Sequence, residues 1–349
     1  TLTLKNFTLT NGYTESYGCT GGGGLLVTAD DMYNLWGDRM TTNAVIENLI
    51  IEGNHSHNGG GLSIFRVDGP SLSNVIIRNN TNSFMGAGIF HYGSSSTMND
   101  VEIHGNVGYG SEFGGYYNMG HGGGIFFTGS DGTFTGINIH DNSAPFHGGG
   151  IGAEGRNSWT MTNSTIRDNV ANWLGGGLWL WDNNNGSGDL EGASPTLTNV
   201  TIENNVSSLP GGGVLASNSN PVFENCTIQN NNAAGNGGGI CFWGGCRAIL
   251  TGCLISGNTG SGEGGGIYTE GEKITMTRCT VVNNVCDAWN GGISVSGTAA
   301  TLINCTISGN TAPYGGGIEM WNYGSATITN SIIWDNFPTA VSIWDGNAT

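Results

Sequence analysis

Positively charged side chains are scarce in this chain of 349 residues. Nine lysines and arginines stand against 26 aspartates and glutamates, so the formal net charge is −17 at pH 7. A surface with this balance repels phosphate groups. The composition therefore argues against nucleic acid or an anionic membrane surface as a partner.

Long apolar runs are missing as well. No stretch approaches the length that spans a membrane, and the sequence has neither an initiator methionine nor a signal peptide. The chain begins inside a repeat, at residues 1–4. We therefore expect a processed or excised piece of a longer protein, with no membrane span in this chain.

The chain also lacks a composition that favours helices. The 64 glycines, together with frequent Asn, Thr and Ser, would destabilise helix interiors. What the chain has instead is a repeat of about 26 residues, as in NCTIQNN…NGGGIC and NCTISGN…YGGGIE. Such a period predicts a solenoid, in which each turn of chain, here called a coil, buries its apolar side chains against neighbouring coils.

Each coil carries one asparagine, with an aliphatic residue three positions before it and another apolar residue eight positions before it. These asparagines are Asn54, Asn80, Asn106, Asn142, Asn169, Asn205, Asn231, Asn258, Asn284, Asn310 and Asn336. Around them apolar and polar residues alternate, which is typical of strands with one buried face. We predict an all-β fold, a right-handed parallel β-helix of about twelve coils with three parallel sheets.

The repeat is unbroken, so the sequence predicts a single β-helix domain over residues 1–349. Longer intervals between asparagines place loop insertions near 28–42, 108–120 and 183–194. We expect the asparagines to form a ladder of amides that fixes a turn between sheets, because asparagine tolerates a left-handed backbone. The glycine triplets precede strands and not helices, which excludes a phosphate-binding loop.

Four cysteines share one inward-facing register: Cys226, Cys253, Cys279 and Cys305. We interpret them as a stack of small buried residues, while bridges between coils and a Cys241–Cys246 pair stay open. His104 and His140 are expected to stack on the outer face of one sheet. Such a pair is more often solvated than metal-bound. We predict no metal site and no cofactor, and leave incidental Ca²⁺ binding open.

Large aromatic residues occupy outward positions in the strand that follows the glycines. They are Phe65, Phe90, Tyr92, Phe126, Trp179, Trp181, Trp243, Tyr268, Trp321 and Trp344. A contiguous exposed aromatic stripe usually marks an interaction surface, and sugar rings of a polysaccharide or cell-surface glycan would stack on it. Two alternatives remain: loops bury these rings, or the rings contact a filament or protein partner.

Acidic residues lie beside this stripe. Glu154 and Asp182 fall on adjacent coils, so their carboxyls could approach as the pair of a glycosidase does, and they are the candidate catalytic residues. Further acids are Glu270, Glu319, Asp189 and Glu191. Arginine and lysine are nearly absent from the stripe, which argues against a uronate lyase.

The repeats NCTISGN…GGGI and the segment 328–336 resemble the secreted right-handed β-helix repeat proteins of bacterial surfaces, distantly similar to the polymorphic outer-membrane protein repeat family. The resemblance implies an exported adhesin or surface protein. Enzymes of the pectate-lyase-like architecture share the same fold, so the fold alone does not separate a binder from an enzyme.

The main hypothesis from the sequence is a non-enzymatic extracellular scaffold or adhesin that binds glycan through the aromatic stripe. Neither end of the chain reads as a polar cap, so coils at the two ends could stack head to tail into fibres. The rival hypothesis is a polysaccharide lyase or glycoside hydrolase that uses Glu154 and Asp182.

Overall fold

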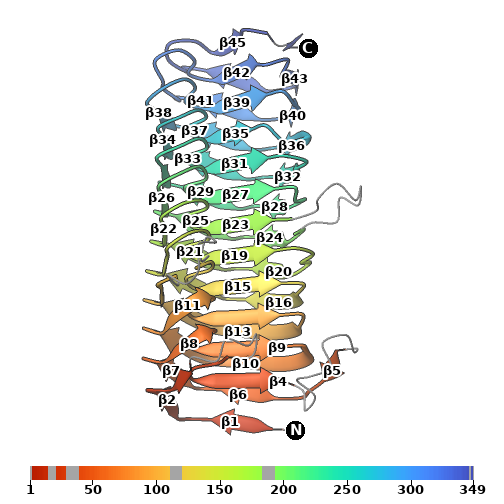
Figure 1. The fold of residues 1–349 in the computed structure, drawn as a ribbon. Coiled ribbons are helices and arrows are strands. Elements are labelled where there is room, and N and C mark those ends of the chain that lie inside the picture. Colours follow the sequence, from red (N-terminus) through yellow and green to blue (C-terminus); the bar gives the residue numbers. More distant parts are fainter. Residues whose placement is uncertain are drawn as a thin grey trace.

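The computed structural model describes residues 2–14, 21–28, 39–110, 120–182, 193–345 and 347–348. Every regular element within them is a strand, and none of them forms a helix long and apolar enough to cross a membrane. The coils stack into a rod, with the N-terminal strands at one end and the C-terminal strands at the other (Figure 1). The predicted parallel β-helix with three parallel sheets is confirmed, with about 11 turns instead of twelve.

Three parallel sheets run along the rod. Sheet A contains 24 strands among the described residues, in two columns that the long strands β10 (Val67–Arg78) and β13 (Ser95–His104) join. Its first column holds β1 (Thr3–Lys5), β5 (Met40–Thr41), β6 (Val45–Glu47), β16 (Asp131–Thr135), β20 (Thr160–Thr162), β24 (Thr196–Thr198), β28 (Val222–Glu224), β32 (Arg247–Thr251), β36 (Lys273–Thr277), β40 (Ala299–Ile303), β43 (Ser325–Thr329) and β46 (Asn347–Ala348). Its second column holds β2 (Thr8–Thr10), β7 (Ile50–Glu52), β17 (Asn138–His140), β21 (Thr165–Arg167), β25 (Thr201–Glu203), β29 (Thr227–Gln229), β33 (Leu254–Ser256), β37 (Thr280–Val282), β41 (Thr306–Ser308) and β44 (Ile332–Trp334).

Sheets B and C complete each coil. In the described part of the chain, sheet B has ten short strands: β3 (Tyr13–Thr14), β8 (His55–Asn58), β11 (Thr81–Met85), β14 (Val107–Gly108), β18 (Ser143–Ala144), β22 (Val170–Ala171), β26 (Val206–Ser207), β30 (Asn232–Ala233), β34 (Thr259–Gly260) and β38 (Val285–Cys286). Sheet C has twelve: β4 (Leu25–Thr28), β9 (Leu62–Phe65), β12 (Ile89–Tyr92), β15 (Ile125–Thr128), β19 (Ile151–Glu154), β23 (Leu178–Trp181), β27 (Val214–Ser217), β31 (Ile240–Trp243), β35 (Ile267–Thr269), β39 (Ile293–Ser296), β42 (Ile318–Trp321) and β45 (Val341–Ile343). Most of each predicted insertion lies outside the described residues, and the single domain stays a prediction.

Inward-facing side chains form one continuous apolar core along the rod. Equivalent aliphatic residues lie on successive coils, as Ile202, Ile228 and Ile255 do in sheet A, and each of these three is fully buried. A solenoid is stable only when such columns stack, because one coil alone would leave its apolar face in water.

The asparagine column forms the predicted ladder. Asn231 Nδ2 donates to Oδ1 of Asn258 at 3.0 Å and to the carbonyl oxygen of Ile202 at 2.9 Å. Its own Oδ1 accepts from the backbone N–H and the side chain of Asn205, at 2.9 and 3.0 Å. The pattern repeats from Asn54 to Asn336, so each buried amide is satisfied by the coils next to it.

The prediction that the ladder asparagines themselves adopt a left-handed backbone is wrong. The left-handed residue of the turn is the one that precedes the ladder asparagine, for example Asn230 with φ 55° or Asn283 with φ 56°. The ladder asparagines themselves, including Asn231 and Asn284, are not among the described residues with positive φ. Each turn therefore uses two neighbouring residues: the first adopts the left-handed backbone, and the second, the ladder asparagine, supplies the stacking amide.

The cysteines of the described residues are all buried, free thiols. Cys226, Cys253, Cys279 and Cys305 form the expected inward stack, and the Sγ of Cys253 lies 3.4 Å from the carbonyl oxygen of Phe223. Cys241 and Cys246 are also unpaired. Small buried side chains, and not disulfides, explain this column.

Candidate functional site

Sheet C carries the side chains that position the candidate site. The second residue of each of its strands points out of the coil interior, and the strand register aligns these residues along the rod. We call them the outer column, which contains Leu26, Ser63, Phe90, Phe126, Gly152, Trp179, Leu215, Cys241, Tyr268, Ser294, Glu319 and Ser342.

Most of the outer column is covered, which corrects the prediction of an exposed aromatic stripe. Five of the predicted ligand-binding residues are buried: Phe65 (2% exposed), Phe90 (3%), Phe126 (0%), Trp179 (4%) and Tyr268 (3%). They form a second hydrophobic cluster outside the coil interior with Leu174, Leu215 and Cys241. Side chains buried in this way stabilise the fold and offer no open surface to a glycan.

The covering residues come from the turns that precede the glycine triplets. Leu174 lies directly before one triplet, and His147, which lies before another, stacks on Trp179 with ring centroids 4.7 Å apart. Phe65 is covered in a different way, by stacking on Tyr92 at 4.9 Å. The alternation of the strand predicts that these rings leave the coil interior, but it does not reveal this outer layer.

The other five predicted aromatics retain exposed surface. Tyr92, Trp181, Trp243 and Trp321 are partly exposed, and Trp344 is 61% exposed. Only Trp321 and Trp344 among them line the pocket described next.

A pocket of about 360 Å³ opens where the outer column loses its large apolar residues. After Tyr268 the column continues with Ser294, Glu319 and Ser342. Two serines cannot fill the space that phenylalanine, tryptophan or leucine fills in earlier coils. The described residues that line the pocket are Glu263, Trp289, Glu319, Trp321, Trp344 and Asp345.

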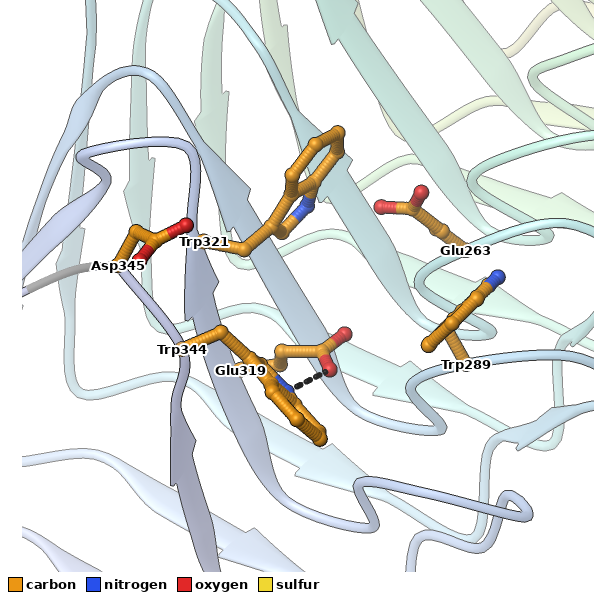
Figure 2. A pocket seen from close by; sticks show the side chains of 6 residues that line it. All are labelled: Glu263, Trp289, Glu319, Trp321, Trp344 and Asp345. Atoms are coloured by element: carbon orange, nitrogen blue, oxygen red, sulfur yellow. Dashed lines mark hydrogen bonds between the residues drawn. The ribbon is translucent and has the colours of Figure 1, made fainter.

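Two carboxyl groups face the interior of this pocket between indole rings (Figure 2). Glu319, in β42, accepts a hydrogen bond from Nε1 of Trp344 at 2.9 Å. Glu263, in the turn between β34 and β35, accepts one from Oγ of Ser294 at 3.2 Å. Figure 2 also shows the indole nitrogen of Trp321 turned toward the Glu263 carboxyl. Residues from four successive coils therefore build one cavity.

Burial raises the pKa of both carboxyl groups above the usual range. For Glu263, the Ser294 hydroxyl and the Trp321 indole N–H act in the opposite direction, and the charge of Glu270 raises the pKa further. For Glu319, the Trp344 N–H lowers the pKa and the charge of Glu263 raises it. Both carboxyls are therefore easier to protonate than a glutamate on the open surface, and burial is the main cause.

Sequence reasoning found part of this pocket. Trp321 and Trp344 were predicted to bind ligand, and Glu319 was noted as an acid beside them, whereas Glu263, Trp289 and Asp345 were missed. The sequence contains one local sign that this turn differs from the others, because Asn290 replaces the first glycine of the triplet in its coil. In the structure Asn290 lacks the positive φ that Gly264 has in the coil before.

The predicted catalytic pair lies elsewhere on sheet C. Glu154 pairs with Trp181 in the strand register, and Asp182 follows Trp181 directly. Burial raises the pKa of both carboxyls, while Arg156 lowers that of Asp182. No finding tests a catalytic role for these two residues, which stays a prediction.

His104 and His140 stack as expected, with ring centroids 4.8 Å apart. His140 uses Nδ1 for Asp141 at 2.7 Å and Nε2 for Glu102 at 3.0 Å. Both of its ring nitrogens are therefore occupied by carboxylates. Among the described residues, no group of three or more His, Cys, Asp or Glu side chains could hold a metal ion.

Three solved structures are similar to this chain at low sequence identity. The crystal structure of the Agl-KA catalytic domain has a TM-score of 0.46 and 19% identity, with 87% of this chain covered. The tailspike protein gp49 from Pseudomonas phage LKA1 has a TM-score of 0.38 and 15% sequence identity, and the match also covers 87% of this chain. The chain spans 58% and 50% of the lengths of these two proteins.

A third solved structure, the A-module of the Azotobacter vinelandii mannuronan C-5 epimerase AlgE6, has a TM-score of 0.35 and 14% identity, over 99% of this chain and 91% of its own. No curated protein matches the chain in sequence. The predicted kinship with the polymorphic outer-membrane protein repeats finds no support.

The model of the right-handed β-helix region matches residues 2–188 and 149–333. These overlapping matches contain the asparagine ladder from Asn54 to Asn310 and most of the pocket, and they supply the handedness that the strand pattern alone did not show. The chain belongs to the right-handed β-helix family.

Proposed function

We propose that this chain is a glycoside hydrolase module that cleaves a neutral polysaccharide at the pocket of Glu263 and Glu319. The observation that carries the proposal is a pair of carboxyl groups with raised pKa values, the buried Glu319 and the partly buried Glu263, which share one pocket with three tryptophans. Glycoside hydrolysis requires two carboxyls in different protonation states on either side of a sugar ring.

Glu319 is assigned the role of general acid. The negative charge of Glu263 disfavours ionisation of Glu319, and only one donor, the indole N–H of Trp344, favours the ionised form. Glu263 accepts a hydrogen bond from the Ser294 hydroxyl and faces the Trp321 indole N–H, which makes no hydrogen bond of its own. Both groups favour ionised Glu263, which is therefore assigned the role of carboxylate. The pair can thus hold one proton on Glu319 and one negative charge on Glu263.

The reaction follows from these roles. Sugar rings stack on the indoles of Trp289, Trp321 and Trp344, which orient the glycosidic bond between the carboxyls. Glu319 gives its proton to the leaving oxygen as the bond from that oxygen to the anomeric carbon breaks, and Glu263 stabilises the positive charge that develops on the ring. Water supplies the new hydroxyl at the anomeric carbon, and its proton restores Glu319.

The lining residues favour an uncharged substrate. None of the described residues around the pocket is basic, and Asp345 adds a third carboxyl to Glu263 and Glu319. A uronate or sulfate group would be repelled there and would find no cation to pair with. The same absence of a cation argues against a lyase acting on uronates.

The test is turnover of neutral polysaccharides, followed by the release of reducing ends. We expect activity on at least one neutral glycan, and a loss of 10²-fold or more in Glu319→Gln and Glu263→Gln at unchanged folding. Glu224→Gln, which alters an exposed acid on sheet A, is the matched control and should keep full activity. Unchanged turnover in Glu319→Gln would overturn the proposal.

A non-enzymatic glycan-binding role uses the same pocket and is the second candidate. Its support is the exposed indole of Trp344 beside Trp321, since such surfaces bind sugars without cleaving them. Tight glycan binding without any product would select it. Location outside the cell and head-to-tail fibres remain part of this proposal, and sedimentation at high concentration tests the fibres.

A further inference from the structure

Trp289 belongs to the pocket and also to an aromatic pair that extends outside it. It lines the pocket together with Glu263 and Glu319 (Figure 2). Its ring stacks on that of Tyr314, with centroids 4.8 Å apart and an angle of 28° between the ring planes. Tyr314 itself is not one of the described residues that line the pocket. The pair therefore continues the aromatic surface of the pocket beyond its rim.

The backbone holds this pair in register. Trp289 and Tyr314 lie in successive coils, at the corner where the chain passes from the side of sheet B to sheet C. The carbonyl oxygen of Trp289 accepts a hydrogen bond from the backbone N–H of Gly315 at 2.9 Å, and Asn290 pairs with Gly315 in an isolated bridge. Because successive coils are about 4.8 Å apart, the two rings stack at the spacing of the backbone. A ligand finds the pair already formed.

Both rings are open to solvent. Trp289 is 46% exposed and Tyr314 is 54% exposed, although each ring covers part of the other. The buried rings of sheet C, such as Phe126 and Trp179, lack this access. A stacked aromatic pair that stays half exposed and adjoins a pocket is typical of a binding surface.

The surroundings of the pair favour an uncharged ligand. The two turns that carry it, residues 286–289 and 311–315, contain one charged residue, the acid Asp287. An aromatic face offers apolar contact to the C–H face of a sugar ring, and the Tyr314 hydroxyl can exchange a hydrogen bond with a sugar hydroxyl. An anionic sugar would find no cation in either turn. The pair thus matches the class of ligand assigned to the pocket.

We propose that Tyr314 forms an outer sugar-binding subsite, which adjoins the pocket through Trp289. A neutral polysaccharide that occupies the pocket continues over the pair toward the C-terminal end of the rod, and one of its outer units rests on the ring of Tyr314. This inference rests on the proposed hydrolase function and adds to it a preference for long chains over short ones.

The test measures kcat/KM on the polysaccharide that the wild type cleaves and on its oligosaccharides of increasing length. Tyr314→Ala should lose about fivefold to tenfold on the polysaccharide, mainly through KM, and less than about twofold on the shortest oligosaccharide that is cleaved. Tyr314→Phe keeps the aromatic face and should stay within about twofold of the wild type at every length.

Trp173→Ala is the matched control. Trp173 is 42% exposed at the same corner and stacks on Phe146 with ring centroids 5.3 Å apart, but it does not line the pocket. Its replacement should leave kcat/KM unchanged on all substrates. Tyr314→Leu covers the case in which the alanine variant unfolds, because leucine keeps an apolar contact with Trp289 while the aromatic face is lost, and it should show the same length-dependent loss.

Two results would overturn the subsite while leaving the hydrolase function intact. The first is an equal loss at every substrate length in Tyr314→Ala and Tyr314→Leu, since Tyr314 would then act only by holding Trp289 in place. The second is an unchanged kcat/KM on the polysaccharide in either variant, with folding checked by the thermal midpoint.

Failure of the hydrolase function gives a different result, namely no turnover by the wild type on any neutral glycan. The subsite is then tested by calorimetry with the same oligosaccharides. A gain in affinity with length that the wild type shows and Tyr314→Ala lacks supports the subsite. Equal affinities in the two proteins at every length, or no binding by the wild type, overturn it.

Discussion

Trp344 Nε1 donates a hydrogen bond to Oε1 of Glu319 at 2.9 Å. The two residues lie one coil apart, and the bond favours the ionised form of a carboxyl whose pKa is raised by burial and by the charge of Glu263. An indole N–H can only donate, so its removal cannot be compensated by a reversed bond. The Trp344–Glu319 contact therefore tunes the proposed general acid.

Trp344→Phe should move the alkaline limb of the pH–rate profile upward by about one unit. Loss of the donor raises the pKa of Glu319, and a general acid is active until the pH rises through its pKa. Phenylalanine keeps an aromatic face for the sugar, which limits the effect on KM. Trp243→Phe, on a sheet C strand outside the pocket, should leave the profile unchanged; an alkaline limb that stays in place in Trp344→Phe would contradict the assignment.

Ser294→Ala should act on the opposite limb. The Ser294 hydroxyl favours ionised Glu263, so its removal raises the pKa of that carboxyl. A carboxylate loses its function as the pH falls through its pKa, and the acidic limb should therefore rise by about half a unit to one unit. The measurement is kcat/KM between pH 3 and 7, with Ser217→Ala as control. A shift of the alkaline limb alone would reverse the roles of the two glutamates.

Much of this architecture follows from sequence because a solenoid repeats its constraints. The inward columns, such as Ile202 and Ile228, must be apolar in every coil, and the ladder asparagines must recur in register. Outward positions carry no such constraint. Phe126 and Trp321 both alternate out of the core, yet one is fully buried and the other lines a pocket.

The difference between those two outward residues lies in turns that the strand pattern does not describe. Glu263 and Trp289 reach the pocket from turns before glycine triplets, and they meet Glu319 only through stacking of coils. Their conformation depends on local backbone, such as the altered turn at Asn290. The fold could be predicted, whereas the site required the three-dimensional arrangement of turns.

Asn231→Ala should lower the free energy of unfolding by about 2–4 kcal/mol. The substitution removes donors and an acceptor that serve Ile202, Asn205 and Asn258, and it leaves buried polar groups without partners. Urea unfolding followed by circular dichroism gives the value. Asn199→Gly is the control, because Asn199 is exposed and has φ 54°, and its side chain bonds only to the surface amide of Asn163. It should change stability by less than about 1 kcal/mol.

Reducing agent should not change the stability of the chain. Cys226, Cys253, Cys279 and Cys305 are free thiols in the buried stack, so no covalent bond between them contributes to folding. Thermal unfolding with and without reductant should give the same midpoint when the sample is protected from oxidation. A midpoint that falls by several degrees on reduction would indicate disulfides between coils and contradict the stacked-thiol interpretation.

Two carboxyl pairs on sheet C compete for the catalytic role, and substitutions separate them. Glu154 lies beside the partly exposed Trp181, while Glu319 shares an enclosed cavity with Glu263. Because the proposed reaction needs a protonated and an ionised carboxyl in the same pocket, Glu154→Gln should keep turnover within about twofold, and Glu319→Gln should lose 10²-fold or more. Both changes replace one carboxyl with an amide of nearly the same size, so the two variants are matched in the chemistry of the substitution. If Glu154→Gln alone abolished turnover, the catalytic centre would lie at Glu154 and Asp182, and the pocket of Glu319 would be a binding site.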